Sequence, residues 1–510
     1  MNGVDVRETL LKLDTEEKRE RIKVMRDYFF YRGKSISLEL AKHNPIFYGQ
    51  NWPVNEKLDY KPTQDIRNKT KHLLKKQARF MFSVPPTLNI KPDDLNNKDR
   101  AEELRKFIED ILEDNKFWKI TKQAFLMATI EKRVLLRVEA NPEEPLKIKY
   151  ETIDNISYKE TDGKLLEAKI FESSPVNALY KDGDDKRVYY LNIYGYKTDN
   201  EGNLLPDVYY TRETYTNNEF DTPISSVEVD TGFTDIPCWL IVNGGELNDG
   251  YGESDLEDLM EPQKLYNKKN SDFADALRFQ LFGAIAVIDG NRDDVARMEI
   301  RPNALHAIRT SDEAAEQSKQ ASITREEYSM GNATAIEAYL TRLDNDMRDI
   351  LDMPDLKDLT NIPSAKAMRY MYNDLIARCE EKWADWEPIF KSMIDFILKV
   401  VPAIKAYPTF QADWLSMAYT LYFEHNYPIP DDTDTKKDTA MAEVTTNVRS
   451  INSYLKEYSN EEDTDAEYNK ILEEKAQLAA VENGSAQLDE NAVNNSGDDN
   501  NSSNEDDIDE

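Results

Sequence analysis

The chain has 510 residues and a formal net charge of −33, and charged residues make up 32% of it. This length exceeds what a single hydrophobic core supports, so we expect two to four domains. Nucleic-acid binding relies on Lys and Arg that displace counterions from phosphate, so such an acidic balance argues against a conventional nucleic-acid-binding protein.

The cysteines and the apolar stretches argue against disulfides and membrane insertion. The two cysteines, Cys238 and Cys379, form no CxxC pair, which is typical of a protein from a reducing compartment. Residues 1–12 are charged and do not resemble a signal peptide. The most apolar stretch, residues 393–406, is short and interrupted by charges, so we expect a buried helix and no membrane partner.

The first 130 residues predict a mostly helical region. Apolar residues recur at helical spacing in residues 17–30, 66–82 and 101–126. The second of these helices is expected to stop before Pro85-Pro86, because proline lacks an amide donor and clashes with the preceding turn.

From residue 133 to 243 the pattern changes to short alternating strands. Strand-like runs occur at residues 134–138, 147–150, 187–191 and 208–210, and turn dipeptides that end in glycine separate them. We therefore expect a β-rich region of antiparallel strands.

The helical period returns after Gly252. Ser254 and Glu257 have the spacing of a capping box, in which the serine hydroxyl accepts from the glutamate amide and the glutamate side chain reaches back. The predicted helix covers residues 254–280, and Pro262 inside it is expected to cause a kink.

A compact insert separates this helix from a second one. The insert, residues 281–329, opens with an apolar run at residues 283–288 that predicts a buried strand. The second helix, residues 333–353, carries one apolar stripe and is expected to stop at Pro354.

A short polar loop leads into the longest predicted helix. The loop spans residues 355–363, and the helix covers residues 364–400 with a kink expected near Pro388. At 1.5 Å per residue this helix is on the order of 50 Å long. Residues 437–480 are again helical, and the segment 481–510, rich in Asn, Asp, Ser and Glu, is expected to be disordered.

No catalytic, cofactor-binding or metal-binding motif is complete in the sequence. Gly33-Lys34-Ser35 matches the end of a P-loop, but Tyr28 stands where its first glycine belongs, so a surface turn is the favoured interpretation. The four histidines are not spaced for zinc. Neighbouring carboxylates could hold Mg²⁺, but they fall in predicted turns or in the tail, where a solvated surface is the common case. We therefore expect no catalytic residue, no cofactor and no metal.

The clearest basic cluster lies on the helix before Pro85. It consists of Lys69, Lys71, Lys75 and Lys76. Phosphate binding is one interpretation, but a solvated helix face or contacts to acidic neighbours is favoured.

The segment 236–280 combines several short motifs in a fixed order. An apolar strand with Ile236-Pro237 is followed by an Asn-Gly-Gly turn, a Gly-Glu-Ser-Asp-Leu run and a helix with Tyr-Asn and Ser-Asp-Phe-Ala. This order resembles the phage portal proteins of the SPP1-like type, although Asp275 stands where that family frequently has Asn. A weaker pattern extends over residues 25–480. The residues that match family motifs are Gly252, Ser254, Asp255, Leu256, Tyr266, Asn267 and, in a later Ser-Ala-Lys-Ala-Met run, Ser364.

The resemblance implies an architecture. Portal proteins have an α+β, predominantly helical fold, and their subunits close head to tail into a ring, typically a dodecamer, around a central channel. The implied parts are the wing at residues 1–253, a first stem helix at 254–281, the clip at 282–332, a second stem helix at 333–353, the tunnel loop at 354–363, a long helix at 364–400, the crown at 401–480 and a disordered acidic tail at 481–510.

The resemblance also implies a function and partners. The ring would sit at one vertex of the virion capsid, after assembly in the host cytoplasm, as the channel for DNA packaging and ejection. An acidic wall would keep the DNA sliding, because it repels phosphate. The implied partners are further copies of the chain, the terminase large subunit, a head-completion or adaptor protein, the major capsid and scaffolding proteins, and double-stranded DNA.

The tunnel loop and the helix after it supply candidate DNA-facing residues. An equal alternative for the basic ones is that they pair with acids of adjacent subunits. The candidates are Asp355, Lys357, Asp358, Asn361, Lys366 and Arg369.

Two alternatives to a portal protein stay open at this point. A metal-dependent nucleic-acid-processing enzyme that uses acidic clusters predicts Mg²⁺-dependent cleavage of DNA. A non-viral helical scaffold protein predicts no closed ring.

Overall fold

The computed structural model divides the chain into two compact units. The first comprises Met1–Ile362 and Arg369–Pro428, and the second comprises Pro363–Met368 and Ile429–Glu510. The residues described are 6–33, 62–161, 163–173, 188–199, 201, 203–216, 222–245, 250–282, 284–298, 307–326, 331–354, 365–429, 433–459 and 464–493.

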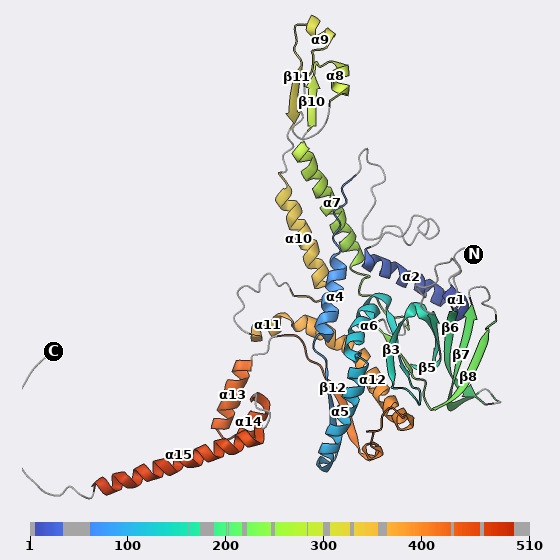
Figure 1. Ribbon diagram of the computed structural model, residues 1–510. Coiled ribbons are helices and arrows are strands. Elements are labelled where there is room, and N and C mark those ends of the chain that lie inside the picture. The colour runs from blue at the N-terminus through green and yellow to red at the C-terminus, as the bar shows by residue number, and fades with distance from the viewer. Residues whose placement is uncertain are drawn as a thin grey trace, which may run out of the picture. The chain divides into compact units, whose positions relative to one another are not determined.

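Helices make up the N-terminal part of the first unit (Figure 1). The single helix expected at residues 101–126 is two helices, because Lys116 has a left-handed φ of 51° and the Asn115 side chain donates to the Ile111 carbonyl at 2.9 Å. The elements are α1 (Val6–Leu11), α2 (Thr15–Arg32), α4 (Lys69–Phe82), α5 (Lys98–Asp114) and α6 (Phe117–Glu131).

Antiparallel sheets confirm the β-rich region expected at residues 133–243. A three-stranded sheet has the order β3-β2-β9, and a five-stranded sheet has the order β4-β5-β6-β7-β8. Apolar side chains cover both faces of the larger sheet, since Ile170 and its neighbour Phe171 belong to different core clusters. The strands are β2 (Arg133–Glu139), β3 (Lys147–Thr152), β4 (Ile156–Thr161), β5 (Lys164–Ser173), β6 (Val188–Thr198), β7 (Leu204–Thr216), β8 (Ser225–Phe233) and β9 (Cys238–Val242).

One strand pair joins distant parts of the sequence. β1 (Thr87–Pro92) pairs antiparallel with β12 (Tyr419–Glu424), a pairing that the local sequence pattern did not predict. Residues 401–428 therefore belong to the first unit, whereas the expected crown began at residue 401.

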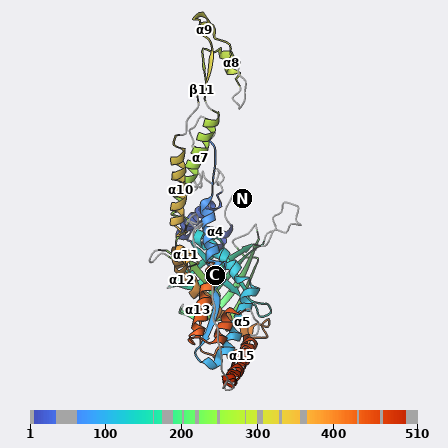
Figure 2. The same ribbon diagram turned by 90° about the vertical axis from the view of Figure 1, so that its left-hand side faces the viewer.

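Two long helices, α7 (Met260–Phe282) and α10 (Ala333–Asp349), lie side by side in both views (Figures 1 and 2). α7 begins at Met260 and not at residue 254, so Pro262 lies in its first turn, where proline costs little and no kink is needed. The chain that connects α7 to α10 forms a small body beyond the far ends of both helices, with β10 (Ala284–Ile288), α8 (Arg292–Ala296), α9 (Asp312–Glu316) and β11 (Ser322–Glu326) (Figure 1).

The strand expected at the start of the insert is present, but it is not buried. β10 pairs antiparallel with β11, and Ile288 is 55% exposed. A two-stranded sheet has too few partners to cover both of its faces.

The long helix expected at residues 364–400 breaks at Tyr372 and not at Pro388. It consists of α11 (Ala365–Met371) and α12 (Asn373–Val400), and α12 continues through Pro388. The Tyr372 ring stacks on Phe80 of α4, with ring centroids 5.3 Å apart and planes 6° apart. The break therefore coincides with an aromatic contact between distant parts of the chain.

The second unit contains α13 (Thr433–Thr445), α14 (Ile451–Tyr458) and α15 (Thr464–Val493). The expectation of disorder from residue 481 is wrong for residues 481–493, which continue α15. Residues 494–510 lie outside the described part of the chain. Among the described helices, none is long and apolar enough to cross a bilayer.

Candidate functional site

The Gly-Glu-Ser-Asp-Leu run forms a turn at the base of α7. Gly252 has a φ of +72°, and a Cβ at this position would lie 2.6 Å from Val242 Cγ1 and 3.1 Å from the carbonyl oxygens of Lys132 and Asn243. Glycine is required both for the left-handed backbone and for the close approach to β9. Glu253 then donates its amide to the Asn243 carbonyl at 2.9 Å, which joins the turn to the end of β9.

Ser254 binds the end of another helix and does not cap α7. Its Oγ lies 3.0 Å from the Ile130 carbonyl oxygen near the end of α6, and it accepts a hydrogen bond from the Leu256 amide at 3.3 Å. The neighbouring Asp255 amide donates to the Thr129 carbonyl at 2.9 Å. The capping box with Glu257 is therefore wrong, because the hydroxyl satisfies carbonyls that α6 leaves open at its C-terminus.

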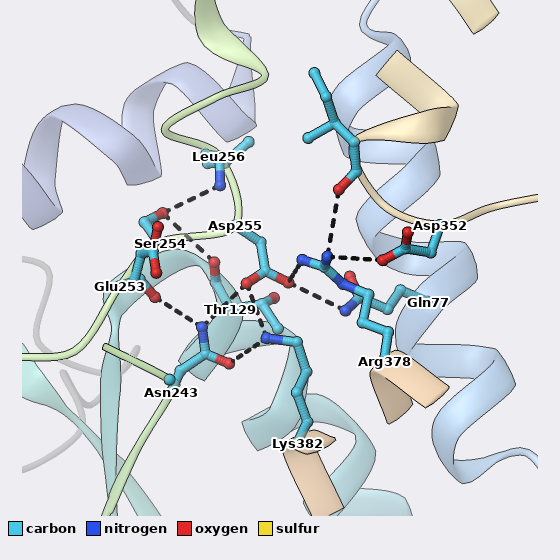
Figure 3. A network of polar contacts seen from close by, with 12 residues as sticks. Gln77, Thr129, Asn243, Glu253, Ser254, Asp255, Leu256, Asp352, Arg378 and Lys382 are labelled. Atoms are coloured by element: carbon cyan, nitrogen blue, oxygen red, sulfur yellow. Dashed lines mark hydrogen bonds and ion pairs between the residues drawn. The ribbon is translucent and has the colours of Figure 1, made fainter. Parts of the chain in front are cut away.

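Asp255 is the centre of a buried polar network (Figure 3). Its side chain is 5% exposed, and its Oδ1 lies 2.9 Å from Lys382 Nζ and 3.1 Å from the side-chain nitrogen Nδ2 of Asn243. Its Oδ2 accepts a hydrogen bond from the side-chain nitrogen Nε2 of Gln77 at 3.1 Å and lies 3.4 Å from Arg378 Nη2. One carboxylate thus joins α4, the end of β9, the base of α7 and α12.

The electrostatics of this network keep Asp255 charged. Burial acts to raise the pKa of Asp255, but the charges of Lys382 and Arg378 and the hydrogen bonds from Lys382 and Asn243 outweigh it and hold the pKa below its usual value. For Arg378, burial acts to lower the pKa, and the carboxylates of Asp255 and Asp352 raise it above the usual value. The network is therefore a set of buried ions that depend on one another.

Arg378 also holds the end of α10. Its Nη1 lies 3.3 Å from the Ile350 carbonyl oxygen and 3.3 Å from Asp352 Oδ2. Both residues belong to the turn that ends α10, so α12 holds α7 and α10 through one guanidinium group (Figure 3).

A second set of contacts fastens α7 to an irregular segment, residues 62–68, which we call the strap. Side chains of α7 at intervals of four residues accept hydrogen bonds from backbone amides of the strap and the start of α4. The four pairs are Asp275 with Thr63 at 2.9 Å, Ser271 with Asp65 at 3.2 Å, Asn267 with Arg67 at 2.9 Å, and Gln263 with Lys69 at 2.8 Å.

The geometry explains the regular spacing of these contacts. Alternate residues of an extended chain are about 6.6 Å apart, and four helical residues rise about 6.0 Å, so every second amide of the strap meets a new turn of α7. Asn267 and Gln263 are fully buried. Asp275 presents both carboxylate oxygens to the Thr63 amide, at 2.9 and 3.2 Å.

Two of the four lysines in the basic cluster on α4 contact neighbouring side chains of the protein. Lys69 Nζ lies 3.0 Å from Asp344 of α10 and 5.3 Å from the centre of the Tyr266 ring of α7. Lys71 lies over the Tyr31 ring at 5.5 Å. These contacts support the interpretation that favoured acidic and local partners over phosphate.

The structure describes only part of the predicted DNA-facing set. Arg369 is exposed on α11, beside Tyr370, which is 71% exposed. Lys366 lies on α11, and its side chain is not described. The remaining members and one family-motif residue lie outside the described residues: Asp355, Lys357, Asp358, Asn361 and Ser364.

Sequence reasoning found the family-motif residues but missed their partners. Gly252, Ser254, Asp255 and Asn267 were singled out, and each makes a specific contact at α7 or its base. The partners of Asp255 come from elements far apart in the chain. For two of these partners, Arg378 and Lys382, the one local signal is that two basic residues stand four positions apart on the amphipathic helix α12. Asn243 was part of the motif at residues 236–280 without an assigned role, and the missed residues are Gln77, Gln263, Arg378 and Lys382.

The network joins α4, β9, the base of α7 and α12. Over the residues that the structure describes, no group of three or more His, Cys, Asp or Glu side chains is placed to hold a metal. His425 is mostly buried, stacks on Trp383 with ring centroids 4.8 Å apart, and lies 2.7 Å from the Met81 carbonyl oxygen. Both cysteines are buried and unpaired.

Comparison with known proteins identifies one family. The family model described as phage portal protein, SPP1 Gp6-like, matches residues 10–480. No curated protein matches the chain.

Proposed function

Because the chain belongs to the SPP1 Gp6-like family of phage portal proteins, we propose that it is one subunit of a closed ring through which DNA enters and leaves a phage capsid. The observation that carries the proposal is the family match over residues 10–480. The pair of long helices, α7 and α10, supports the proposal as a stem, and the small body in the chain that connects them supports it as a clip.

The parts of the portal are assigned to the observed elements with some changes of boundary. α7 and α10 are the stem helices, and β10, α8, α9 and β11 are the clip. Residues 354–363 are the tunnel loop, and α11 and α12 follow it. The helical elements before α7 and the sheets form the wing. Since residues 401–428 pack into the first unit, the crown is confined to residues 429–480.

The charge of the chain fits a channel through which DNA slides. A net charge of −33 repels phosphate, so DNA is kept away from the wall and strong contacts do not slow its passage. Any basic contact would be local, and Lys366 and Arg369, next to the tunnel loop, are the candidates. Asp355, Lys357, Asp358 and Asn361 of the loop complete the DNA-facing set.

The proposed ring has a structural role and works with other proteins. It is a dodecamer at one capsid vertex, assembled in the host cytoplasm with major capsid and scaffolding proteins. The terminase large subunit supplies the ATPase during packaging, and a head-completion or adaptor protein replaces it at the clip. The chain itself is not an enzyme and needs no cofactor or metal.

Capsid assembly with and without this chain tests the function. Capsids assembled with it are expected to take up DNA when terminase and ATP are added, and capsids assembled without it are expected to stay empty. Nuclease-resistant DNA per capsid measures the difference.

A control separates the channel from the enzyme alternative. The purified chain with Mg²⁺ and linear DNA is expected to leave the DNA intact. Equal filling of capsids that lack the chain, or Mg²⁺-dependent cleavage of the DNA, would contradict the proposal.

A further inference from the structure

β9 is an edge strand whose outer side has no partner among the described residues. The Asn243 amide, just after β9, donates to the Lys132 carbonyl at 2.8 Å, so Asn243 faces β2. In an antiparallel pair alternate residues face away from the neighbouring strand, so the amides of Leu240 and Val242 face outward. Neither amide donates to any described residue, which leaves the outer edge of β9 open.

The opposite edge of the same sheet is partly closed by side chains. At the start of β3, the outward amide of Leu146 donates to the Tyr407 hydroxyl at 3.0 Å, and the outward amide of Ile148 donates to Asn115 Oδ1 at 2.8 Å. Covering an edge in this way prevents pairing with another chain. The two outward amides of β9 have no such cover, so β9 is able to accept a further strand.

The open edge of β9 lies in a groove with two walls. α12 forms one wall, where Phe396 contacts the Trp239 ring with centroids 5.8 Å apart. The β4–β5 hairpin forms the other, where Leu165 belongs to the same core cluster as Cys238. The hollow between the walls measures about 550 Å³, and Leu240 lines it. An added strand would place its side chains against the two walls in turn, because successive side chains of a strand point to opposite faces.

The two walls differ in chemistry. The α12 wall presents Ile389 and Phe396, and its Lys399 is already paired with Asp235 at 3.2 Å. The hairpin wall carries the exposed Lys164, whose Nζ lies 4.7 Å from the centre of the Tyr196 ring, and the carboxylate of Glu160. A strand with apolar side chains at alternate positions and a carboxylate between them therefore fits the groove.

β8 is a second edge strand, and it has this pattern. Residues 225–230 are all exposed, and Val227 and Val229, which flank Glu228, are 54% and 47% exposed. An exposed apolar edge strand favours pairing with another chain. The strand order β4-β5-β6-β7-β8 directs the outer edge of β8 away from the β4–β5 hairpin that walls the groove.

A closed ring requires two such surfaces on each subunit. In head-to-tail assembly one surface of a subunit contacts a different surface of the next, so the two surfaces lie on different sides of the chain. The edge of β8 and the groove along β9 meet this requirement, and each supplies the unpaired edge that the other lacks.

We propose that β8 of one subunit adds to the open edge of β9 in the next subunit, so that a β-sheet continues across the subunit contact. The two valines of β8 lie against the α12 wall, and Glu228 faces Lys164 on the hairpin wall. The inference rests on the proposed function, because the contact has a place only in a ring.

Proline at Leu240 tests the added strand. Proline lacks the amide donor, and it is tolerated on an edge strand where that amide faces outward. Leu240→Ala is the matched control, because it loses the same side chain but keeps the donor. The protein concentration that gives half-maximal ring assembly is expected to be at least about ten-fold higher for Leu240→Pro than for Leu240→Ala. Equal assembly of the two folded variants would overturn the proposal.

A charge exchange tests the partner strand and does not depend on how well the proline variant folds. Both Glu228 and Lys164 are exposed, so their substitution leaves the fold of one chain intact. Glu228→Lys and Lys164→Glu are each expected to weaken assembly by about five-fold, and the double variant is expected to restore it. Thr222→Lys adds a positive charge at an exposed position before β8 and is expected to leave assembly unchanged.

Failure of this inference is distinguishable from failure of the proposed function. If the native chain forms no closed ring, the proposed function is wrong. If native rings form but the double charge variant assembles no better than either single variant, the contact between β8 and β9 is wrong and the ring closes through other surfaces.

Discussion

Asp255→Ala is expected to destabilise the chain by about 3–5 kcal/mol and to prevent it from assembling. The substitution leaves Lys382 and Arg378 buried without their shared carboxylate, and it removes the acceptor of Gln77. An uncompensated buried charge costs far more than the loss of a surface ion pair. The free energy of unfolding in urea and the yield of assembled protein measure the effect.

The control for Asp255→Ala is Asp258→Ala. Asp258 is an exposed carboxylate three residues further along the same segment, and its loss is expected to change the free energy of unfolding by less than about 0.5 kcal/mol. Similar stability of the two variants would contradict the assignment of Asp255 as the centre of the network.

The pH dependence of the same contact gives a second check. The pKa of Asp255 is lower in the folded chain than its ordinary value of 3.8, so the stability it contributes is present above that value and is lost as the pH falls through its folded pKa. The difference between the native chain and Asp255→Ala is therefore expected to shrink below about pH 4. A difference that stays constant from pH 7 to pH 3 would show that Asp255 is not held in its charged form.

Deletion of residues 356–361 is expected to leave rings intact and to abolish most DNA filling. The deleted residues lie within the proposed tunnel loop, and the contacts of Arg378 with Ile350 and Asp352, just before the loop, are retained. Assembly therefore has no reason to fail, whereas the proposed contact with passing DNA is removed. Nuclease-resistant DNA per capsid is the measurement, with intact rings in the same preparation as the internal control. Normal filling by rings with this deletion would contradict a role for the loop in DNA passage.

Local pattern was sufficient to predict most helices and the β-rich region. Apolar spacing located α4 and α10 within a few residues, and alternation located β2, β3 and β7. These elements bury one face or one stripe, and such burial leaves a period in the sequence. The order of short motifs at residues 236–280 was sufficient to identify the family, and the match over residues 10–480 confirms it.

Features set by distant contacts could not be predicted in this way. The start of α7 was wrong because the Ser254 hydroxyl binds the end of α6, and nothing in the local sequence signals that competing acceptor. Likewise, the break at Tyr372 coincides with its stacking on Phe80, nearly three hundred residues earlier in the chain. The same holds for the pairing of β1 with β12.

The candidate site shows the same limit. Asp255 and Asn267 were identified as members of a family pattern, but their roles depend on partners from other elements. The strap contributes backbone amides, which have no sequence signature at all.

Negative-stain microscopy of the purified chain tests the portal ring most directly. Over a range of salt and protein concentrations, we expect closed rings with a central channel, because the family forms cyclic assemblies whose head-to-tail contacts close on themselves. Only monomers or open filaments under all of these conditions would contradict the assignment of this chain as a subunit of a DNA channel.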